Sequence, residues 1–390
     1  MKIVVAMDSF KGSLSSLEAG EAAALGIREV YPDARIVVRP LADGGEGTVD
    51  ALVPGLNGQL RHVTVTGPAG RPVCASYGII QEKKLAVMEM ASAAGLTLVP
   101  ENKRNPMITT TYGVGEMILD AVAHGCRRFM IGLGGSGTND GGAGMLMALG
   151  YGFLDREGRT ISFGAAGLER LAKITKENVK PELSDCEFMV ACDVANVLCG
   201  PDGCSAVYGP QKGANQEMIE YMDGWLSHYA DLAAEIDGRA DPGFPGAGAA
   251  GGMGFAFKTF LNARLEPGVS IVLRETSLEE EICGADIVVT GEGCIDGQTA
   301  MGKAPAGAAA LAKKHGVPVV ALAGCVAGDA KLCNGQGIDA FFSILPRAMD
   351  LNEAMEPETA KKHLEASAVQ VFRLWKTACQ RPGNPLAERL

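Results

Sequence analysis

Short apolar strands and amphipathic helices alternate at the start of the chain. Residues 2–7 are apolar and rich in β-branched side chains, which predicts a buried strand of a parallel sheet. Ser15 and Glu18 have the spacing of a capping box, and apolar positions then recur near one helical face until Pro32, which predicts a helix. Residues 35–41 predict the second strand of a βαβ unit.

The same alternation returns near the other end of the chain. There the pattern predicts a helix at 305–315 and three strands, at 286–290, 317–323 and 340–345. We expect these strands to join the first two in one parallel sheet, with the intervening residues forming an inserted domain. The predicted domains are therefore a discontinuous one, 1–60 plus 285–390, and an inserted one, 61–284.

The middle of the chain predicts a second set of strands and helices. Residues 66–70 contain Gly and Pro between two extended segments, 61–65 and 73–80, and so predict a hairpin. Further strands are expected at 85–90, 128–133 and 188–192, and helices at 113–124, 143–149 and 216–236. Residues 242–254 are rich in Gly, Ala and Pro and predict a loop, while the polar tail after Lys376 is expected to add little to the core.

Composition narrows the class of protein. The 390 residues are 47% hydrophobic, which is enough to close cores and excludes a disordered chain. The net charge of -11 repels phosphate backbones, so no nucleic-acid partner is expected. The 11 cysteines show no Cys-x-x-Cys spacing, and no apolar run approaches the roughly 20 residues of a membrane span. We therefore expect a cytoplasmic protein without a membrane partner.

Three glycine-rich loops with carboxylates follow predicted strands. They cover residues 8–13, 42–48 and 291–296. One such loop is commonly explained by turn conformation alone, but three at the carboxyl ends of parallel strands favour a ligand site. The candidate residues in these loops are Lys11, Ser13, Asp43, Gly44, Glu46, Glu292 and Asp296.

A further loop, 132–142, holds six glycines between a predicted strand and a predicted helix. Its backbone amides suit a phosphate cradle, for which the candidates are Gly134, Gly135, Ser136, Gly137 and Thr138. Two alternatives remain open. Gly132, Gly134 and Gly137 also fit the Gly-x-Gly-x-x-Gly fingerprint, with Asp155 as its acid, which would indicate an NAD-dependent oxidoreductase; or the loop is only structural.

Two more residues are candidates for phosphoryl chemistry. Lys303 ends a Gly-x4-Gly-Lys segment that lacks the Ser/Thr of a Walker A motif, but it precedes a predicted helix whose free amides favour anions. Asp193 follows the predicted strand at 188–192, where a carboxylate is placed to accept a hydroxyl proton or, alternatively, to cap the next element.

These segments together resemble the type I, bacterial-style glycerate kinase family. The resemblance rests on Asp-Ser-Phe-Lys-Gly-Ser at 8–13, Pro-Leu-Ala-Asp-Gly-Gly-Glu-Gly-Thr at 40–48, the loops 132–142, 209–214 and 245–254, Thr-Gly-Glu-Gly at 290–293, Gln298-Thr299 and Gly302-Lys303. They occur in family order over nearly the whole chain. One departure is Val197, where the family pattern has proline after Asn196.

The resemblance implies an α/β fold of two domains, a Rossmann- or flavodoxin-like parallel sheet from both chain ends and an inserted α/β domain, with the site in the cleft between them. It implies phosphorylation of D-glycerate by ATP, most often at the 2-hydroxyl; 3-phosphoglycerate as product and a non-catalytic sugar-acid sensor are alternatives. Phosphoryl transfer requires positioning and charge neutralisation, so we expect Mg²⁺ at Asp296 and Glu292. Asp193 is the expected base. Lys11 and Ser13 are expected to bind the glycerate carboxylate, and Asp43 and Glu46 are expected to bind its hydroxyls or the metal. The oligomeric state is not indicated.

Overall fold

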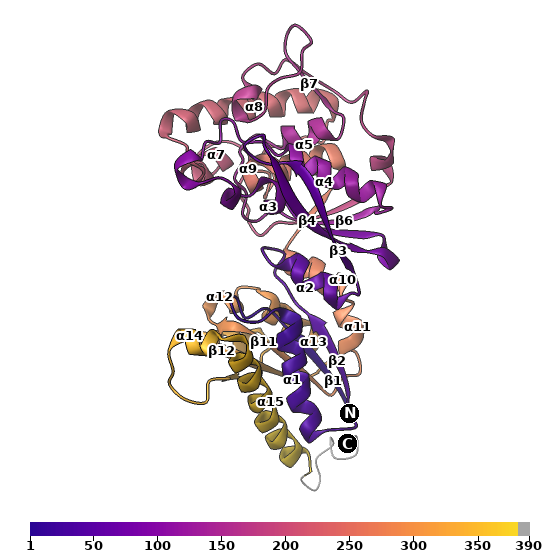
Figure 1. The fold of residues 1–390 in the computed structure, drawn as a ribbon, viewed down its shortest axis with the longest axis vertical. Helices are drawn as coiled ribbons and strands as arrows, with labels where there is room; N and C mark the ends of the chain where they lie inside the picture. The colour runs from indigo at the N-terminus through magenta and orange to yellow at the C-terminus, as the bar shows by residue number, and fades with distance from the viewer. Residues whose placement is uncertain (381–390) are drawn as a thin grey trace. The chain divides into compact units, whose positions relative to one another are not determined.

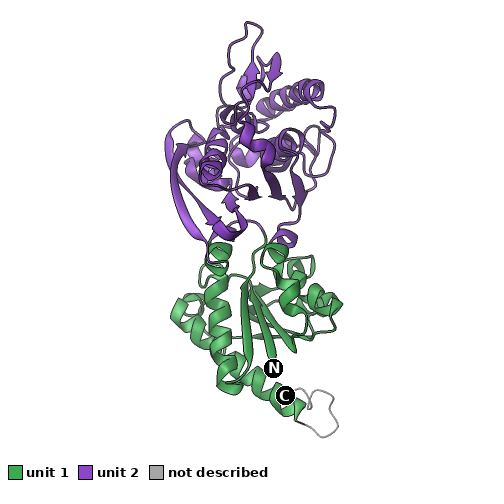
Figure 2. Cartoon of the chain, turned by 90° about the vertical axis from the view of Figure 1, so that its right-hand side faces the viewer, with its two compact units in different colours: residues 1–43, 50–56, 272–390 green, residues 44–49, 57–271 purple. Residues whose placement is uncertain are grey.

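The computed structural model describes residues 1–380, which form two compact units (Figure 2). Of the described residues, unit 1 comprises 1–43, 50–56 and 272–380, and unit 2 comprises 44–49 and 57–271. The domain bounds expected from the sequence remain a prediction, because a compact unit need not fold alone. Most of the tail that follows Lys376 lies outside the described residues.

Unit 1 contains a parallel sheet of five strands in the order β13-β12-β11-β1-β2. Its strands are β1 (Lys2–Met7), β2 (Arg35–Pro40), β11 (Ile287–Ile295), β12 (Val319–Val326) and β13 (Ala340–Ser343). This confirms the expected sheet from both ends of the chain. From β1 the sheet grows towards β2 on one side, whereas β11, β12 and β13 follow on the other. The order therefore reverses between β1 and β11, and ligands of open parallel sheets bind at such a switch point.

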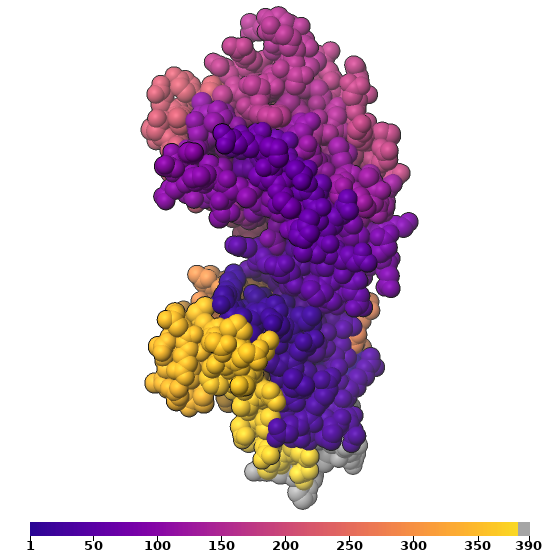
Figure 3. Space-filling model, in the orientation of Figure 1, coloured from indigo at the N-terminus to yellow at the C-terminus, as the bar shows by residue number. Residues whose placement is uncertain are grey.

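Helices cover both faces of this sheet. Ile3 and Val5 pack in one core with α1 (Ser16–Val30) and α15 (Pro357–Cys379), while Val4 and Ala6, which point to the opposite face, are fully buried as well. Figures 1 and 3 show α15 lying against the N-terminal segment. The other helices with residues in this unit are α2 (Thr48–Gly55), α10 (Gly268–Glu275), α11 (Leu278–Ile282), α12 (Gly297–Ala300), α13 (Ala304–Lys314) and α14 (Leu351–Met355).

Unit 2 contains a mixed sheet of six strands in the order β10-β9-β6-β5-β4-β3. The antiparallel strands are β3 (Gln59–Thr66), β4 (Pro72–Ile80) and β5 (Leu85–Glu89), and the strands that continue in parallel are β6 (Arg128–Gly132), β9 (Glu187–Ala191) and β10 (Arg264–Glu266). A separate pair is formed by β7 (Gly152–Leu154) and β8 (Lys173–Thr175). The helices are α3 (Ala91–Ala94), α4 (Tyr112–Ala123), α5 (Ala143–Ala148), α6 (Ala165–Leu168), α7 (Cys204–Tyr208), α8 (Gln216–Ile236) and α9 (Ala249–Leu261).

Two predicted boundaries were wrong. Residues 291–295 were expected to form a loop but continue β11, because Glu292 and Cys294 pair with Ala323 and Cys325 of β12. The loop expected at 242–254 ends early, because α9 already occupies its last residues. Ala250, Gly251 and Gly252 have positive φ and interrupt α9, whose regular part follows them. Neither long-range pairing nor burial of an Ala/Gly-rich segment can be recognised from local composition.

None of the described helices combines the length and the apolar character that a membrane crossing requires.

Candidate functional site

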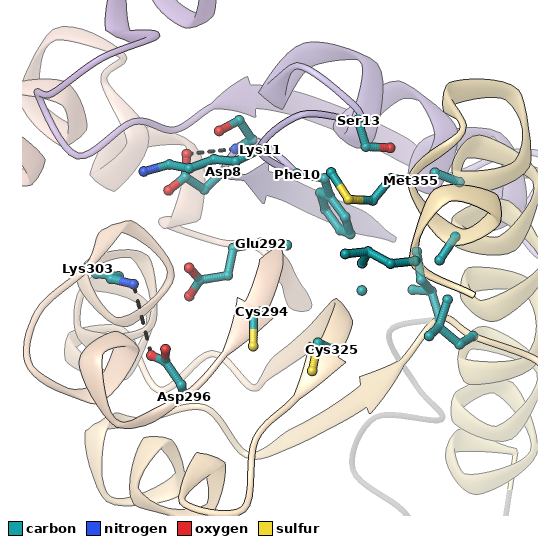
Figure 4. Close-up of a pocket in the computed structure, with 18 of the residues that line it drawn as sticks. Asp8, Phe10, Lys11, Ser13, Glu292, Cys294, Asp296, Lys303, Cys325 and Met355 are labelled. Carbon is teal, nitrogen blue, oxygen red and sulfur yellow. Dashed lines mark hydrogen bonds and ion pairs between the residues drawn. The ribbon is translucent and has the colours of Figure 1, made fainter. Parts of the chain in front are cut away.

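Unit 1 contains a cavity of about 520 Å³ at the carboxyl ends of its parallel strands (Figure 4). The cavity has a polar end and an apolar end. The polar end is lined by Asp8, Lys11, Asp43, Glu292, Asp296 and Lys303. The apolar end is lined by Phe10, Ile344, Leu345, Met349, Leu351, Ala354, Met355 and Ala360, with Cys294 and Cys325 on neighbouring strands. The structure therefore brings five of the predicted residues together at the polar end, and Ser13 also contributes to the lining.

Each lysine of the polar end faces a carboxylate at a distance that leaves it available to a ligand. Lys11 Nζ lies 4.0 Å from Asp43 Oδ2, and Lys303 Nζ lies 4.0 Å from Asp296 Oδ1 (Figure 4). The Lys11 side chain is 76% exposed, so this ion pair contributes little to stability. The two ammonium groups can reorient towards an anion without giving up a short hydrogen bond.

Asp296 has a structural role as well. Its Oδ1 accepts hydrogen bonds from the amides of Gln298 (2.9 Å) and Thr299 (3.0 Å), and it thereby caps α12. Its Oδ2 makes no hydrogen bond within the described chain. The capping bonds hold the carboxylate in one orientation, with one oxygen left over for a cation or a water molecule.

Glu292 is 7% exposed and lies next to this capped turn. Thr299 donates its hydroxyl to Glu292 Oε1 at 2.7 Å. Burial raises the pKa of Glu292 above its ordinary value, while the Thr299 hydrogen bond and the nearby charge of Lys303 act in the opposite direction. A second cation beside this carboxylate would favour its charged form.

Asp8 is a site residue that was not among the candidates. It follows β1 directly and is 7% exposed, and its Oδ1 accepts a hydrogen bond of 2.7 Å from the Ser9 amide. Burial, followed by the charges of Asp43 and Glu292, raises the pKa of Asp8 to about 7. Its position at the end of a buried strand was the available signal, but its burial depends on residues from the far end of the chain.

The donor set of the polar end suits a hard divalent cation. Its carboxylates offer oxygen ligands, which Mg²⁺ prefers, and no set of three or more His, Cys, Asp or Glu side chains within residues 1–380 is arranged to hold a metal by itself. Mg²⁺ usually keeps several waters and binds through one or two carboxylates together with substrate phosphates. The residues present therefore fit a Mg²⁺ ion that enters with a phosphorylated ligand.

Unit 2 contains a second cavity, of about 420 Å³, at the carboxyl ends of β6 and β9. Its lining includes the predicted residues Gly44, Gly134, Gly135, Ser136 and Asp193. Asp193 is exposed, and its Oδ1 accepts a hydrogen bond of 3.3 Å from the Gly268 amide. Gly44 has a φ of +85°, and a Cβ there would lie 2.5 Å from Gly268 Cα, so only glycine fits.

The amides of Gly134, Gly135 and Ser136 donate to no acceptor within the described chain, although the chain on either side is held. Leu133 donates to Ala191, and the Gly135 carbonyl accepts from Leu96 at 2.8 Å. Gly135 has a φ of +72°. Successive free amides around a left-handed residue form a concave anion-binding nest.

Three predicted residues lie elsewhere. Gly137 and Thr138 do not line the cavity: the Gly137 amide donates to Ala94 at 2.9 Å, and Thr138 is fully buried. Glu46 is exposed and belongs to the lining of neither cavity. Asp43 and Gly44, adjacent in sequence, line different cavities. The Ser13 hydroxyl is buried and has no hydrogen-bond partner in the described chain.

The dinucleotide interpretation finds no support in the position of Asp155. This residue follows β7, which belongs to the small separate sheet. Its Oδ1 accepts hydrogen bonds from the amides of Glu157 and Arg159, and its Oδ2 accepts one from Arg159 Nε at 3.0 Å. A dinucleotide-binding acid instead ends the second strand of the main sheet and keeps its oxygens for a ribose.

Two buried charged side chains, Lys212 and Asp140, make hydrogen bonds that hold the 132–142 loop in place. Lys212 is fully buried, and its Nζ donates a hydrogen bond of 2.7 Å to the Thr138 carbonyl. Asp140 accepts hydrogen bonds from the amides of Thr111, Gly142 and Gly144. Burial lowers the pKa of Lys212 to about 8 and raises that of Asp140. Sequence analysis placed Lys212 only within the 209–214 segment, because its burial is a tertiary property.

Comparison with known proteins gives a consistent result. The glycerate kinase family matches residues 3–376. Glycerate kinase of Bacillus subtilis (strain 168) is 48% identical over 378 residues, which cover 97% of this chain and 98% of the relative. Glycerate 2-kinase of Escherichia coli (strain K12) is 48% identical over 357 residues, covering 91% and 93%. A crystal structure from Salmonella typhimurium LT2, described as a glycerate kinase 2, is similar with a TM-score of 0.90 at 45% identity, covering 98% of this chain and all of that one.

Proposed function

Because the chain belongs to the glycerate kinase family, we propose that it transfers the terminal phosphoryl group of ATP to the 2-hydroxyl of D-glycerate, with Mg²⁺. The match over residues 3–376 is the observation that carries the proposal. The name of the Escherichia coli relative, glycerate 2-kinase, supports the choice of hydroxyl.

The charges at the polar end of the unit 1 cavity support the proposed use of Mg²⁺. When all four carboxyl groups are ionised, Asp8, Asp43, Glu292 and Asp296 outnumber Lys11 and Lys303, so a triphosphate would then meet net repulsion without a divalent cation. Glu292 and Asp296 each keep a carboxylate oxygen for Mg²⁺ or its waters. Glu292 and Asp296 would hold Mg²⁺, which would supply positive charge to offset that of the phosphates.

The remaining residues of the polar end have separate roles in the proposal. Lys303 pairs with phosphate oxygens. Lys11 binds the carboxylate of glycerate, and Asp43, which lies 4.0 Å from Lys11, accepts a hydrogen bond from a glycerate hydroxyl. A short acid with a carboxylate and two hydroxyls is thereby oriented by one cation and one acceptor.

The unit 2 cavity supplies an anion site and a base. The amides of Gly134, Gly135 and Ser136 offer hydrogen-bond donors to phosphoryl oxygens, and the Asp193 carboxylate is the group proposed to accept a hydroxyl proton. The new bond joins glycerate oxygen to phosphorus, and the bond from phosphorus to the bridging oxygen of ADP breaks. Fixed amides stabilise the transferring group because they need no reorientation as its charge changes.

A phosphorus NMR spectrum of a reaction with D-glycerate and Mg-ATP tests the activity and its regiochemistry together. We expect ADP and 2-phosphoglycerate in equal amounts. A 3-phosphoglycerate signal would overturn the assigned hydroxyl but not the kinase activity. No phosphoglycerate at all would refute the proposed function, and Mg-ATP hydrolysis without D-glycerate is the control.

A further inference from the structure

The apolar end of the unit 1 cavity has no counterpart in glycerate. Its walls come from the loop after β1, the chain after β13 and helix α14. Glycerate is a three-carbon acid with oxygen on every carbon, so it has no apolar surface to place against Phe10, Ile344 or Met355. The cavity of about 520 Å³ is also far larger than such an acid needs and falls within the range of about 300–1,000 Å³ that is common for small-molecule and cofactor sites.

We infer that this apolar end binds the base of the nucleotide donor, with the base lying over the ends of β12 and β13 and the phosphates directed to Lys303. The inference rests on the proposed kinase function. Of the two substrates, only the nucleotide combines a flat aromatic ring with a polyanion, and the cavity combines an apolar end with lysines in the same arrangement (Figure 4).

The position in the fold supports the same assignment. The polar end lies at β1 and β11, where the strand order reverses, and the apolar end extends from there across β12 and β13. Open parallel sheets hold nucleotides in this way, with phosphates at the switch point.

Helix α14 provides the side chains that would adapt to a ring. Met355 reaches the loop after β1, since a Cβ on Gly12 would lie 2.8 Å from Met355 Cε. Met349, in the segment before α14, also lines the apolar end. Flexible thioether side chains fill irregular space and make favourable contacts with aromatic rings. A base inserted here would contact them and cover the apolar surface that the cavity now exposes.

Alkylation of Cys325 tests the inference directly, because this exposed thiol lines the apolar end. Cys283, exposed in the same unit and absent from the cavity lining, is the matched control. We expect adenosine, and more strongly Mg-ADP, to slow N-ethylmaleimide labelling of Cys325 about 5-fold or more at saturation. Two control ligands, Mg²⁺-tripolyphosphate and D-glycerate, are each added by themselves. Neither should change the labelling rate of Cys325. Protection by tripolyphosphate but not by adenosine, or by no ligand, would overturn the inference.

A pair of variants on α14 gives a kinetic test. Ala354→Phe fills the apolar end, whereas Asn352→Phe places the same side chain on an exposed position of the same helix. We expect Ala354→Phe to raise KM for ATP about 10-fold or more, equivalent to about 1.4 kcal/mol of binding, with KM for D-glycerate nearly unchanged. Equal KM values for ATP in the two variants would contradict the inference. If Ala354→Phe does not fold, the Cys325 labelling experiment still tests the inference, because it uses the wild-type protein.

The two proposals fail in different ways. If the wild-type protein forms no phosphoglycerate, the proposed function fails, whatever adenosine does to Cys325. If phosphoglycerate forms but adenosine and Mg-ADP leave Cys325 reactive, the kinase stands and the base binds elsewhere.

Discussion

Replacement of Lys212 by methionine tests how the 132–142 loop is supported. Lys212 is fully buried, and within residues 1–380 its ammonium group donates one hydrogen bond, from Nζ to the Thr138 carbonyl. Desolvation of the ammonium lowers the pKa of Lys212 from 10.5 to about 8, although the nearby Cys204 and Asp140 favour the charged form. Methionine keeps most of the volume and removes the charge.

The pKa shift determines how stability depends on pH. Between pH 8 and 10.5 the unfolded chain binds more protons at Lys212 than the folded chain, so the free energy of unfolding rises with pH in this window. At about 1.36 kcal/mol per pKa unit, the full effect is about 3.4 kcal/mol, of which about 2.5 kcal/mol is reached between pH 7 and pH 10. Lys212→Met has no group that titrates there, so this part of the pH dependence disappears.

Urea unfolding at pH 7 and pH 10 measures the difference. Unit 2 contains Trp225 and unit 1 contains Trp375, so a Trp375→Phe background leaves fluorescence that reports unit 2. We expect the wild-type minus variant difference to rise by about 2.5 kcal/mol over this range, because other titrating groups cancel. The exposed Lys103→Met variant is the control.

Parallel pH dependence in the wild type and Lys212→Met would refute the reasoning, since it would mean that Lys212 keeps its ordinary pKa in the folded protein. If the wild-type minus variant difference in unfolding free energy fell as the pH rises, the fold would have to stabilise the charged form of Lys212. That would contradict the burial of Lys212 in the structure.

Three further predictions concern the site and its support. Asp193→Asn should lower kcat about 10²-fold or more while Mg-ATP binding survives; near-normal turnover would remove Asp193 as the base. Gly135→Val should abolish turnover because residue 135 is held at a φ of +72° and a Cβ there would already lie 3.1 Å from the Cβ of Ala91; unchanged activity with Mg-ATP would place the phosphates elsewhere. Asp120→Asn should lower the free energy of unfolding by about 1–3 kcal/mol at pH 7. The reason is that the Asp120 carboxylate accepts hydrogen bonds from Arg61 and, at 2.6 Å, from the Tyr77 hydroxyl. The Arg61 hydrogen bond lowers the pKa of Asp120, so this difference from the wild type should shrink in urea unfolding as the pH falls below 4, and a constant difference would contradict the assignment.

Local patterns predicted the parts of the fold whose causes are local. The capping box at the start of α1 forms as expected: Glu18 donates its amide to Ser15 Oγ, and Ser15 donates its own amide to Glu18 Oε2. The β-branched runs at both ends of the chain become parallel neighbours, which confirms the α/β class. These elements could be predicted because their hydrogen bonds and hydrophobic periodicity involve residues close in sequence.

Candidate site residues could be found because a strand that enters a glycine-rich loop is visible in the sequence. The sequence could not show which of these residues line the same cavity. Lys303 lines the unit 1 cavity with Lys11, whereas Gly135 and Asp193 line that of unit 2. Gly137 belongs to the same motif as Gly135, yet its amide donates a hydrogen bond to the Ala94 carbonyl. Adjacency in a motif does not determine which amides are left free.

The sequence by itself determined the strand and helix pattern, the glycine-rich loops at the strand ends and, through the order of its motifs, the family. Only the tertiary structure decided that β11 extends to Ile295, that Asp8 is buried enough to raise its pKa to about 7, and that Lys212 supports the 132–142 loop. Strand extension, desolvation and burial arise from contacts between residues far apart in the chain, and such contacts leave no periodic signal in the sequence.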